Sequence, residues 1–399
     1  MDAETDYTEA QRLIAECCGE SLDLSSLENL VAIPSEIAQC RQLKQLNVSF
    51  IPITDLSPIE SLSNLRVLDF SGTEVTHLGS LSGLQQLEEL ALWGLGGIED
   101  LSPLAGLEHL KKLDFSCCPI ADITVISAMK NLRVLDCSGS QVTDLSPLAE
   151  QTRLLRLNFA RNPIENFSFL QGLQNLRHLN CSGTKITDLS ALEELSKLSW
   201  LDCFGCEVSD LSPVAKLKNL RWLDCYGCDV SDLSPIATLK KLCWLNCAGT
   251  KITDLSPLKE LSKLFWLDCS DLAVQDALDL VGLTRLEYLD ISKTQIADIQ
   301  GLSPLRNIKE LYLRMLPIKD ISAVSGMSSL RILHCSATQV SDLEAVSGLH
   351  KLEELHCGNT KISDLTPLLS LESLRELGIS YCDIRVDAPE EFWQRVERG

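Results

Sequence analysis

Long apolar runs are missing from this sequence. A membrane-spanning helix needs about 18 or more consecutive apolar residues, and no stretch of the 399 residues approaches that length. The opening segment, MDAETDYTEA, is acidic, whereas a secretory signal begins with basic residues and continues with apolar ones. We therefore expect a soluble protein of the cytoplasm.

Basic residues are few, because 35 Lys and Arg stand against 56 Asp and Glu, which gives a formal net charge of −21. Nucleic acids and anionic membrane surfaces are bound by clustered positive charge. The composition argues against both as partners, and it favours a protein or peptide partner with basic groups of Lys or Arg.

Recognisable catalytic and nucleotide-binding motifs are also missing. The pattern GxxxxGK[S/T], whose backbone cradles nucleotide phosphates, does not occur. No Ser/His/Asp or Cys/His arrangement indicates a nucleophilic centre. We expect no enzymatic activity, no catalytic residue, no cofactor and no metal in this chain.

The sequence does contain a long internal repeat. The pair Leu-x-x-Leu occurs at Leu43/Leu46 and returns every 22 residues up to Leu374/Leu377, with Ile308 in place of the first Leu in one copy and one step of 23 residues across the glycine-rich segment 94–97. This gives 16 repeats, and Leu22-Asp-Leu24 makes a divergent earlier one. A period of this length indicates a solenoid, in which stacked repeats share one core.

A typical unit is LRHLNCSGTKITDLSALEELSK, residues 176–197. Its first part alternates as a strand does, so stacked copies predict one parallel sheet. Its second part carries Asp-Leu-Ser-Pro-Leu in many copies, where Ser suits an N-cap and Pro the next position, which predicts a short 3₁₀ or helical turn. The predicted fold is an α/β repeat solenoid, a leucine-rich-repeat arc with the sheet on its concave face and the turns on its convex face.

The two ends of such a stack need lids, because an end repeat exposes a face lined with leucines. Residues Tyr7 to Cys18 place apolar side chains at helical spacing, and Pro389 to Arg398 begins with Pro and two acidic residues, as helix starts do. We predict an N-terminal helical cap over residues 1–21, repeats over 22–385, and a capping helix over 386–399.

The segments Thr184 to Leu192 (TKITDLSAL) and Thr250 to Leu258 (TKITDLSPL) resemble the 22-residue bacterial leucine-rich repeats typified by the internalins. The usual strand-ending Asn occurs only at Asn162 and is elsewhere mostly Thr or Cys. The internalins are surface adhesins with a signal peptide and a wall anchor, neither of which is visible in this sequence. The resemblance therefore implies the fold of the internalins rather than their location.

The segment Glu9 to Ile37, EAQRLIAECCGESLDLSSLENLVAIPSEI, is similar to the start of the repeat domain in bacterial Roco proteins. The closing segment APEEFWQ, Ala388 to Gln394, looks like the end of such a domain. Roco proteins are cytosolic, and their repeats precede a GTPase domain. This resemblance implies an alternative in which the chain is the sensor or regulatory part of a larger GTPase.

Cysteines are the most misleading feature of the sequence. Cys203-x-x-Cys206 and Cys225-x-x-Cys228 have the spacing of a zinc site. The repeat explains this spacing, because Cys203 and Cys225 occupy a strand position that should be buried. Six other repeats also carry cysteine at that position: Cys137, Cys181, Cys247, Cys269, Cys335 and Cys357. We expect all of them to be reduced packing residues, since cysteine is readily buried.

Aromatic residues gather at one outward-facing strand position of the central repeats: His178, Trp200, Trp222, Trp244, Trp266 and Tyr288. Two residues further on in the same strands, carboxylates stand at Asp202, Asp224, Asp268 and Asp290, and after another two residues Phe204 and Tyr226 appear. Strands lie about 4.8 Å apart, so these positions predict an aromatic stripe beside an acidic one on the concave face.

Two interpretations of the aromatic stripe remain open. Stacked rings could simply stabilise the sheet, because cross-strand aromatic pairs contribute roughly 0.2–1 kcal/mol each. Exposed aromatic surface more often marks an interface, and Trp beside Asp suits a Lys or Arg side chain. We favour binding, with His178, Trp200, Trp222, Trp244, Trp266, Tyr288, Phe204, Tyr226, Asp202, Asp224, Asp268 and Asp290 as the partner-binding residues.

Metal sites have weak support in the sequence. The aspartates that open the Asp-Leu-Ser-Pro turns are too sparse for calcium, and Asp beside a turn normally serves its own backbone. His334 and His356 should be neighbours on the sheet, but a pair alone is weak evidence for a metal site.

The sequence thus predicts a bacterial, cytoplasmic, non-catalytic scaffold for protein–protein interaction. Alternatives are the Roco-type regulatory domain and an effector delivered into a host cell.

Overall fold

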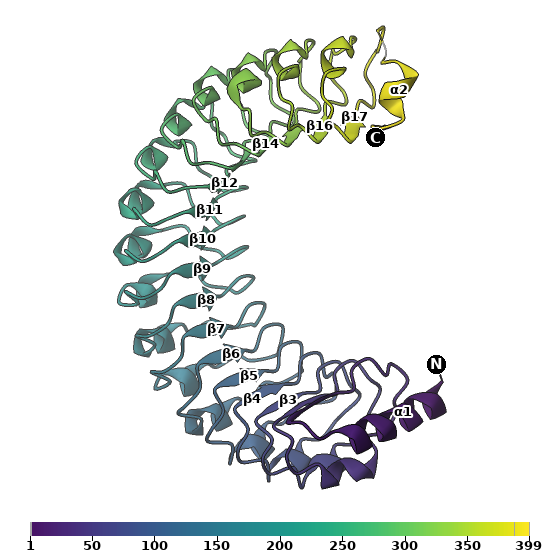
Figure 1. The fold of residues 1–399 in the computed structure, drawn as a ribbon. Coiled ribbons are helices and arrows are strands. Elements are labelled where there is room, and N and C mark those ends of the chain that lie inside the picture. The colour runs from purple at the N-terminus through teal and green to yellow at the C-terminus, as the bar shows by residue number, and fades with distance from the viewer. Residues whose placement is uncertain (1, 387, 399) are drawn as a thin grey trace. The chain divides into compact units, whose positions relative to one another are not determined.

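The computed structural model describes residues 2–386 and 388–398 of the chain. The residues fall into two compact units, 1–186 and 187–399. Both are built in the same way: short strands line one side and short turns line the other (Figure 1). In the second unit the strands follow the inner side of a curved stack (Figure 1).

Each repeat contributes one strand of three residues, and within each unit consecutive repeat strands pair in parallel with matching repeat positions in register. In the first unit the strands are β1 Ser21–Asp23, β2 Gln45–Asn47, β3 Val67–Asp69, β4 Glu89–Ala91, β5 Lys112–Asp114, β6 Val134–Asp136, β7 Arg156–Asn158 and β8 His178–Asn180. In the second they are β9 Trp200–Asp202, β10 Trp222–Asp224, β11 Trp244–Asn246, β12 Trp266–Asp268, β13 Tyr288–Asp290, β14 Glu310–Tyr312, β15 Ile332–His334, β16 Glu354–His356, β17 Glu376–Gly378 and β18 Glu397–Arg398. The predicted parallel sheet of a repeat solenoid is confirmed.

The return path of each repeat contains a 3₁₀ turn, as the sequence predicts. In the first unit the turns are η1 Ser35–Gln39, η2 Ser57–Ile59, η3 Gly79–Leu81, η4 Ser102–Leu104, η5 Thr124–Ala128, η6 Ser146–Leu148 and η7 Ser168–Gly172. In the second they are η8 Ser190–Leu192, η9 Ser212–Lys216, η10 Ser234–Thr238, η11 Ser256–Leu258, η12 Leu278–Leu280, η13 Gln300–Leu302, η14 Ser322–Gly326, η15 Glu344–Val346 and η16 Thr366–Leu368.

The start of these turns differs from the prediction in one respect. Ser is the first residue of the turn rather than its N-cap, and the capping group is the Asp two residues earlier. In η11, Asp254 Oδ1 accepts the Ser256 N–H at 2.8 Å, and Asp254 Oδ2 accepts the Ser256 hydroxyl at 2.8 Å. These hydrogen bonds lower the pKa of Asp254. An Asp carboxylate has two acceptor oxygens, so it can hold both donors of one Ser.

The core is continuous within each unit and consists of the recurring leucines and the strand cysteines. The eight cysteines at the buried strand position have no exposed surface: Cys137, Cys181, Cys203, Cys225, Cys247, Cys269, Cys335 and Cys357. Several thiols contact main-chain carbonyls, as Cys203 Sγ does with Asp224 O at 3.1 Å and Cys228 Sγ with Cys203 O at 3.1 Å. The zinc-like spacing therefore belongs to buried thiols that contact the backbone.

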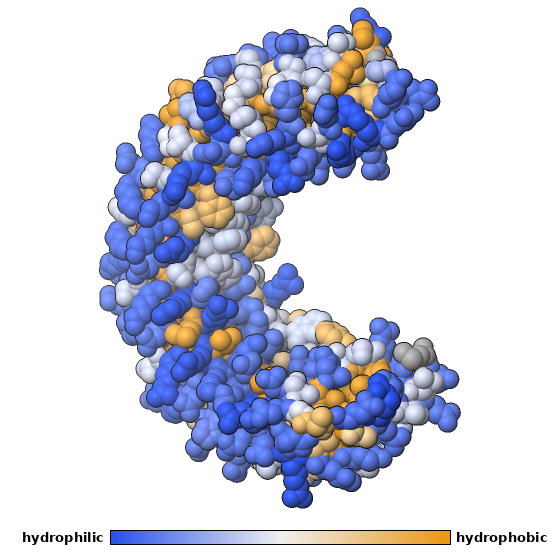
Figure 2. Space-filling model, viewed as in Figure 1, coloured by the Kyte–Doolittle hydropathy of each residue, from blue (hydrophilic) through white to orange (hydrophobic). Residues whose placement is uncertain are grey.

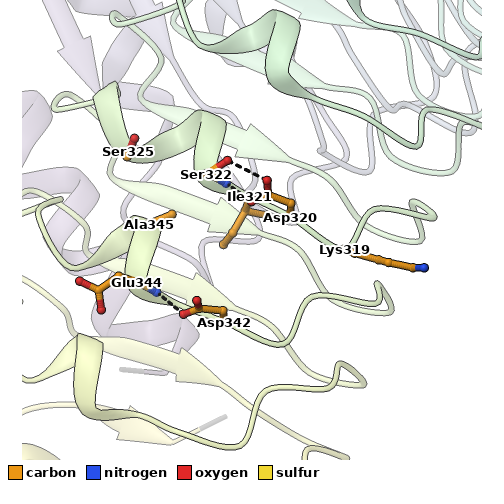
Figure 3. A pocket seen from close by; sticks show the side chains of 8 residues that line it. All are labelled: Lys319, Asp320, Ile321, Ser322, Ser325, Asp342, Glu344 and Ala345. Carbon is orange, nitrogen blue, oxygen red and sulfur yellow. Dashed lines mark hydrogen bonds between the residues drawn. The ribbon is translucent and has the colours of Figure 1, made fainter.

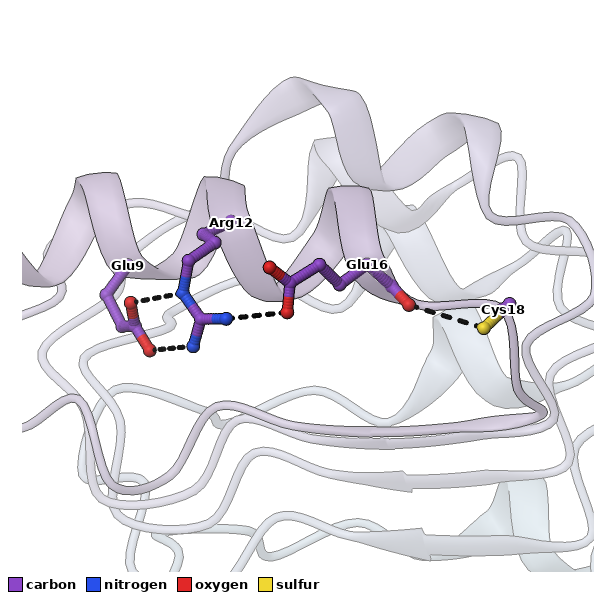
Figure 4. Close-up of polar contacts among 4 residues, drawn as sticks. All are labelled: Glu9, Arg12, Glu16 and Cys18. Carbon is purple, nitrogen blue, oxygen red and sulfur yellow. Dashed lines mark hydrogen bonds and ion pairs between the residues drawn. The ribbon is translucent and has the colours of Figure 1, made fainter.

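The N-terminal helix α1 spans Ala3–Glu16 and begins earlier than the predicted Tyr7. The Asp2 side chain caps it by accepting the Thr5 N–H at 2.9 Å, and an acidic first turn favours a helix start. Its buried face packs against the first repeats, where Asp6 Oδ2 accepts the Asn29 N–H at 2.9 Å. On its outer face Arg12 bridges Glu9 and Glu16 at 2.5 and 2.6 Å (Figure 4).

The C-terminal segment is only partly helical, which corrects the prediction of a helix up to Arg398. The helix α2 spans Glu390–Trp393, and the chain then extends into β18, which pairs with β17. The open edge of β17 explains the change, because the Glu397 N–H reaches Arg375 O at 2.6 Å. Phe392 and Val396 are buried against the last repeat.

The division into residues 1–21, 22–385 and 386–399 stays a prediction as a set of domain boundaries, and Met1, Asp387 and Gly399 lie outside the described residues. None of the described helices has the length and apolar character that crossing a bilayer requires.

We predict that native-state alkylation distinguishes the cysteines by burial. Cys18 and Cys117 are exposed, whereas twelve cysteines are buried. Burial raises the pKa of Cys225 well above its usual value, and only the thiolate is reactive. Iodoacetamide should modify Cys18 and Cys117 in the folded chain, as mass spectrometry of peptides would show. Fast native modification of Cys225 would contradict this account of the core.

Candidate binding surface

The predicted aromatic stripe is a stack of rings on β9 to β13. The strands pair Trp200, Trp222, Trp244, Trp266 and Tyr288 with one another in register. Ring centroids lie 6.0 Å apart for the first pair, then 3.5, 4.2 and 4.5 Å, and the planes of the last three pairs differ by 12° or less. The rings therefore cover one another face to face.

This stacking corrects the expectation of a broadly exposed aromatic surface. Trp244 is only 8% exposed, and the other four rings are half-buried. Each ring lies between neighbours, so solvent reaches the edges of the rings more than their faces. The stabilising ladder weighed in the sequence analysis is therefore present, while binding by the same residues stays a prediction.

Phe204 and Tyr226 form a second, more exposed aromatic pair. They follow β9 and β10 by two residues, are 45% and 42% exposed, and stack with centroids 5.0 Å apart and planes differing by 8°. Figure 2 shows residues of intermediate and high hydropathy, white to orange, along the inner side of the second unit among hydrophilic ones. This pair is the most accessible aromatic part of the candidate site.

The acidic stripe lies beside the Trp stack, at the last residue of the strands. In each of Asp202, Asp224, Asp268 and Asp290, Oδ1 accepts the backbone N–H two residues later, at 2.7–3.0 Å. Asn246 occupies the same position in β11 and accepts the Ala248 N–H at 3.1 Å. One oxygen of each carboxylate thus shapes the chain after the strand, which the sequence analysis did not foresee.

Burial raises the pKa of all four carboxyl groups. The effect is largest at Asp224, whose pKa is raised to about 6 by desolvation and also by the charges of Asp202 and Asp268. Among the described residues, Asp224, Asp268 and Asp290 form no salt bridge. The stripe is therefore a row of partly desolvated negative charge. We call the residues Trp200, Trp222, Trp244, Trp266, Tyr288, Phe204, Tyr226, Asp202, Asp224, Asp268 and Asp290 the aromatic–acidic surface.

His178, the remaining candidate, lies on β8 in the first unit, whereas all the others lie in the second. It is half-buried, and desolvation together with Arg156 and Arg177 lowers its pKa.

The stack extends beyond the residues that the sequence analysis selected. After Tyr288 the rings move to the strand position that Asp290 occupies: Tyr312, His334 and His356 follow, with centroids 5.3, 4.8 and 4.2 Å apart. The sequence contains a signal for this extension, because Tyr312, His334 and His356 stand two residues after the aromatic position in their own repeats.

A hollow on the turn side of the second unit is a weaker candidate. It is lined by Lys319, Asp320, Ser322, Asp342, Glu344 and their neighbours on η14 and η15 (Figure 3). Its aspartates already accept hydrogen bonds from the turns: Asp320 accepts the Ser322 hydroxyl at 2.8 Å, and Asp342 accepts the Glu344 N–H at 2.7 Å. We assign it no binding role.

Comparisons with known proteins agree with this architecture. A family model described as leucine rich repeats in two copies matches residues 108–150, 152–194 and 328–370. A comparison with curated protein sequences gave no match.

Three solved structures illustrate the likeness. An internalin (InlF) of Listeria monocytogenes is 26% identical, covers 94% of both chains and has a TM-score of 0.65. A leucine-rich-repeat protein of Leptospira interrogans is 22% identical, covers 98% of both chains and has a TM-score of 0.75. The ectodomain of the Arabidopsis receptor kinase HAESA, in complex with an IDA peptide hormone, is 16% identical, covers 92% of this chain and 67% of its own, and has a TM-score of 0.67.

Taken with the stacked strands and turns, these matches identify the chain as a leucine-rich-repeat protein that has an internalin and a Leptospira repeat protein among its structural neighbours.

Proposed function

We propose that the chain is a non-catalytic scaffold that binds a protein or peptide partner through its aromatic–acidic surface. The partner presents Lys or Arg side chains, which sit against the exposed faces of Phe204 and Tyr226 and between the carboxylates. The leucine-rich-repeat fold commonly mediates protein–protein interaction, and scaffolds of this family are generally not enzymes. The proposal adds the face, the residues and the chemistry of the partner.

The observation that carries the proposal is that Asp224 and Asp268, in the acidic stripe, form no salt bridge among the described residues. Exposed lysines and arginines elsewhere pair with acids, for example Lys251 with Asp229 at 2.7 Å and Lys259 with Asp279 at 2.7 Å. Asp224 and Asp268 carry raised pKa values instead, because their negative charge is partly desolvated. A Lys or Arg of a partner would relieve this cost, since opposite charges favour the ionised form.

The aromatic groups suit the same kind of partner. A cation within about 6 Å of a Trp or Tyr ring is attracted by the face of the ring. Phe204 and Tyr226 are exposed enough to offer a ring face to a cation, whereas the Trp stack presents mainly ring edges, which do not attract a cation. Trp and Tyr are also the residues on which binding energy is most often concentrated.

The fold of this chain accommodates a peptide ligand in at least one structural neighbour, since the HAESA ectodomain is seen with a peptide hormone. At 16% identity this supports a peptide-binding scaffold by analogy of fold alone. No described feature favours the Roco-type GTPase sensor or the host-delivered effector. A P-loop domain encoded directly after Gly399 would favour the former, in which the same surface would act as a regulatory sensor.

A displayed random-peptide library tests the proposal directly. Selection against the immobilised chain should enrich peptides rich in Lys and Arg. Those peptides should lose binding to a Tyr226→Ala/Asp224→Asn double variant and keep it to a Phe265→Ala control, because Phe265 is a 43% exposed aromatic outside the surface. Enrichment of acidic or purely apolar peptides, or equal binding to both variants, would contradict the proposal.

We predict that Tyr226→Ala and Trp222→Ala have different effects on stability but similar effects on peptide binding. Each substitution should weaken the affinity for a selected basic peptide by at least about tenfold, which corresponds to about 1.4 kcal/mol. Tyr226 is 42% exposed, so its loss should leave the melting temperature nearly unchanged. Trp222 covers Trp244 with centroids 3.5 Å apart, so its loss should also cost about 2 kcal/mol of folding free energy.

Calorimetric titration and thermal unfolding measure the two effects separately. A lowered melting temperature for Trp222→Ala with unchanged peptide affinity for both variants would make the stack a purely structural ladder.

Asp224→Asn should stabilise the chain and weaken binding. The pKa of Asp224 is raised from its ordinary value of 3.8 to about 6 in the folded chain. Ionisation of the carboxylate therefore destabilises the fold increasingly between the two pKa values and by a constant amount above pH 6, and the group is neutral in both states only well below pH 4. The oxygen of the introduced amide can still accept the hydrogen bond from the Tyr226 N–H, as the Asn246 side chain accepts the Ala248 N–H. We expect a melting temperature roughly 1–3 °C higher at pH 7.5, and a gain that shrinks as the pH falls from 6 and disappears only well below pH 4.

Peptide affinity provides the second measurement for this substitution. In the unaltered chain, affinity for a Lys- or Arg-containing peptide should fall as the pH drops through 6, whereas the Asn variant should bind weakly throughout with a shallower dependence. A pH-independent affinity in the unaltered chain would remove Asp224 from the binding surface.

A further inference from the structure

The last part of the ring stack contains two histidines that meet an acidic group. His334 on β15 and His356 on β16 pair in register, and their ring centroids lie 4.2 Å apart. Glu354 precedes His356 by two residues, so both side chains leave β16 on the same face. One ligand atom from each of His334, Glu354 and His356 lies within 4.8 Å of the other two, and all three residues are half-buried.

A second carboxylate supports this cluster from the next strand. Glu376 on β17 pairs in register with Glu354, and its Oε1 lies 3.3 Å from His356 Nε2. Such a carboxylate holds an imidazole in one orientation and one tautomer, and metal-binding histidines usually have a partner of this kind.

The residue next to His356 on the neighbouring strand is a glycine and has no side chain. Gly378 is its register partner, and a Cβ at position 378 would lie 2.5 Å from His356 Nδ1. The backbone of Gly378 is not in the left-handed region, so the glycine is explained by space rather than by φ. On β9 to β16 the same strand position always carries a larger polar or aromatic side chain.

We propose that His334, Glu354 and His356 bind a divalent transition-metal ion, with zinc as the best fit, and that Glu376 orients His356. Two imidazole nitrogens and one carboxylate oxygen are a zinc ligand set that leaves a fourth position for water. Mixed nitrogen and oxygen donors select against calcium and magnesium, which prefer oxygen alone. The ligand atoms reach bonding distance by side-chain rotation, because their strands already place them together.

This site is independent of the aromatic–acidic surface and does not require a peptide partner. It also revises the expectation of no metal, because the sequence showed the histidine pair without the carboxylates that complete it. The eight cysteines at the buried strand position do not compete for the ion, since they have no exposed surface.

Calorimetric titration of the chelator-treated full chain with zinc sulfate tests the proposal, with cobalt chloride as a spectroscopic probe. We expect one ion per chain. His356→Ala and Glu354→Gln should each weaken zinc binding by at least about tenfold, and Gly378→Ala should weaken it by displacing His356 although every ligand is retained. His350→Ala, which removes an exposed histidine outside the cluster, should bind as the unaltered chain does.

Circular dichroism without metal shows whether each variant folds. Glu354→Gln nearly preserves side-chain shape, so the zinc affinity of this variant tests the proposal even if His356→Ala does not fold. Binding that is unchanged in Glu354→Gln, or a cobalt spectrum with thiolate charge-transfer bands, would overturn the proposal, the latter by assigning the ion to cysteines.

Discussion

The structure depends on one constraint: a single repeat of about 22 residues cannot bury its own leucines. Each repeat is stable only when a neighbour covers it, so every strand must pair in parallel at the same repeat position. This turns each position of the repeat into a column that runs through the stack. A residue type repeated at one position therefore becomes a continuous surface or a continuous strip of core.

The columns differ in how they satisfy their polar groups. Aspartates at the turns accept both donors of a serine and have lowered pKa values, as at Asp254. Aspartates at the strand ends accept only one backbone N–H, lie partly buried beside one another and have raised pKa values, as at Asp224. The first column stabilises the fold, and the second opposes it. Proteins commonly hold such unfavourable charge where a ligand will neutralise it.

The ring stack runs through both proposed sites. From Trp200 to Tyr288 the rings keep one position, and from Tyr312 onward they occupy the position of the aspartates. The row of carboxylates therefore ends at Asp290, and Tyr312, His334 and His356 follow at the same strand position. Glu354 and Glu376 then stand at the position vacated by the aromatic rings. The surface changes along the second unit from aromatic and acidic chemistry to imidazole and carboxylate chemistry.

The sequence by itself determined the repeat, the parallel register, the 3₁₀ turns and the columns of Trp, Asp and Cys, because period and alternation follow from backbone geometry alone. Only the tertiary structure decided what the side chains do within a column. Stacking between Trp222 and Trp266 buries Trp244. A hydrogen bond from the Phe204 N–H holds Asp202 against its own chain, and the free edge of β17 pairs with β18. The cluster of His334, Glu354 and His356 combines two columns on two strands. Such contacts depend on rotamers and on neighbouring repeats, which a period in the sequence does not specify.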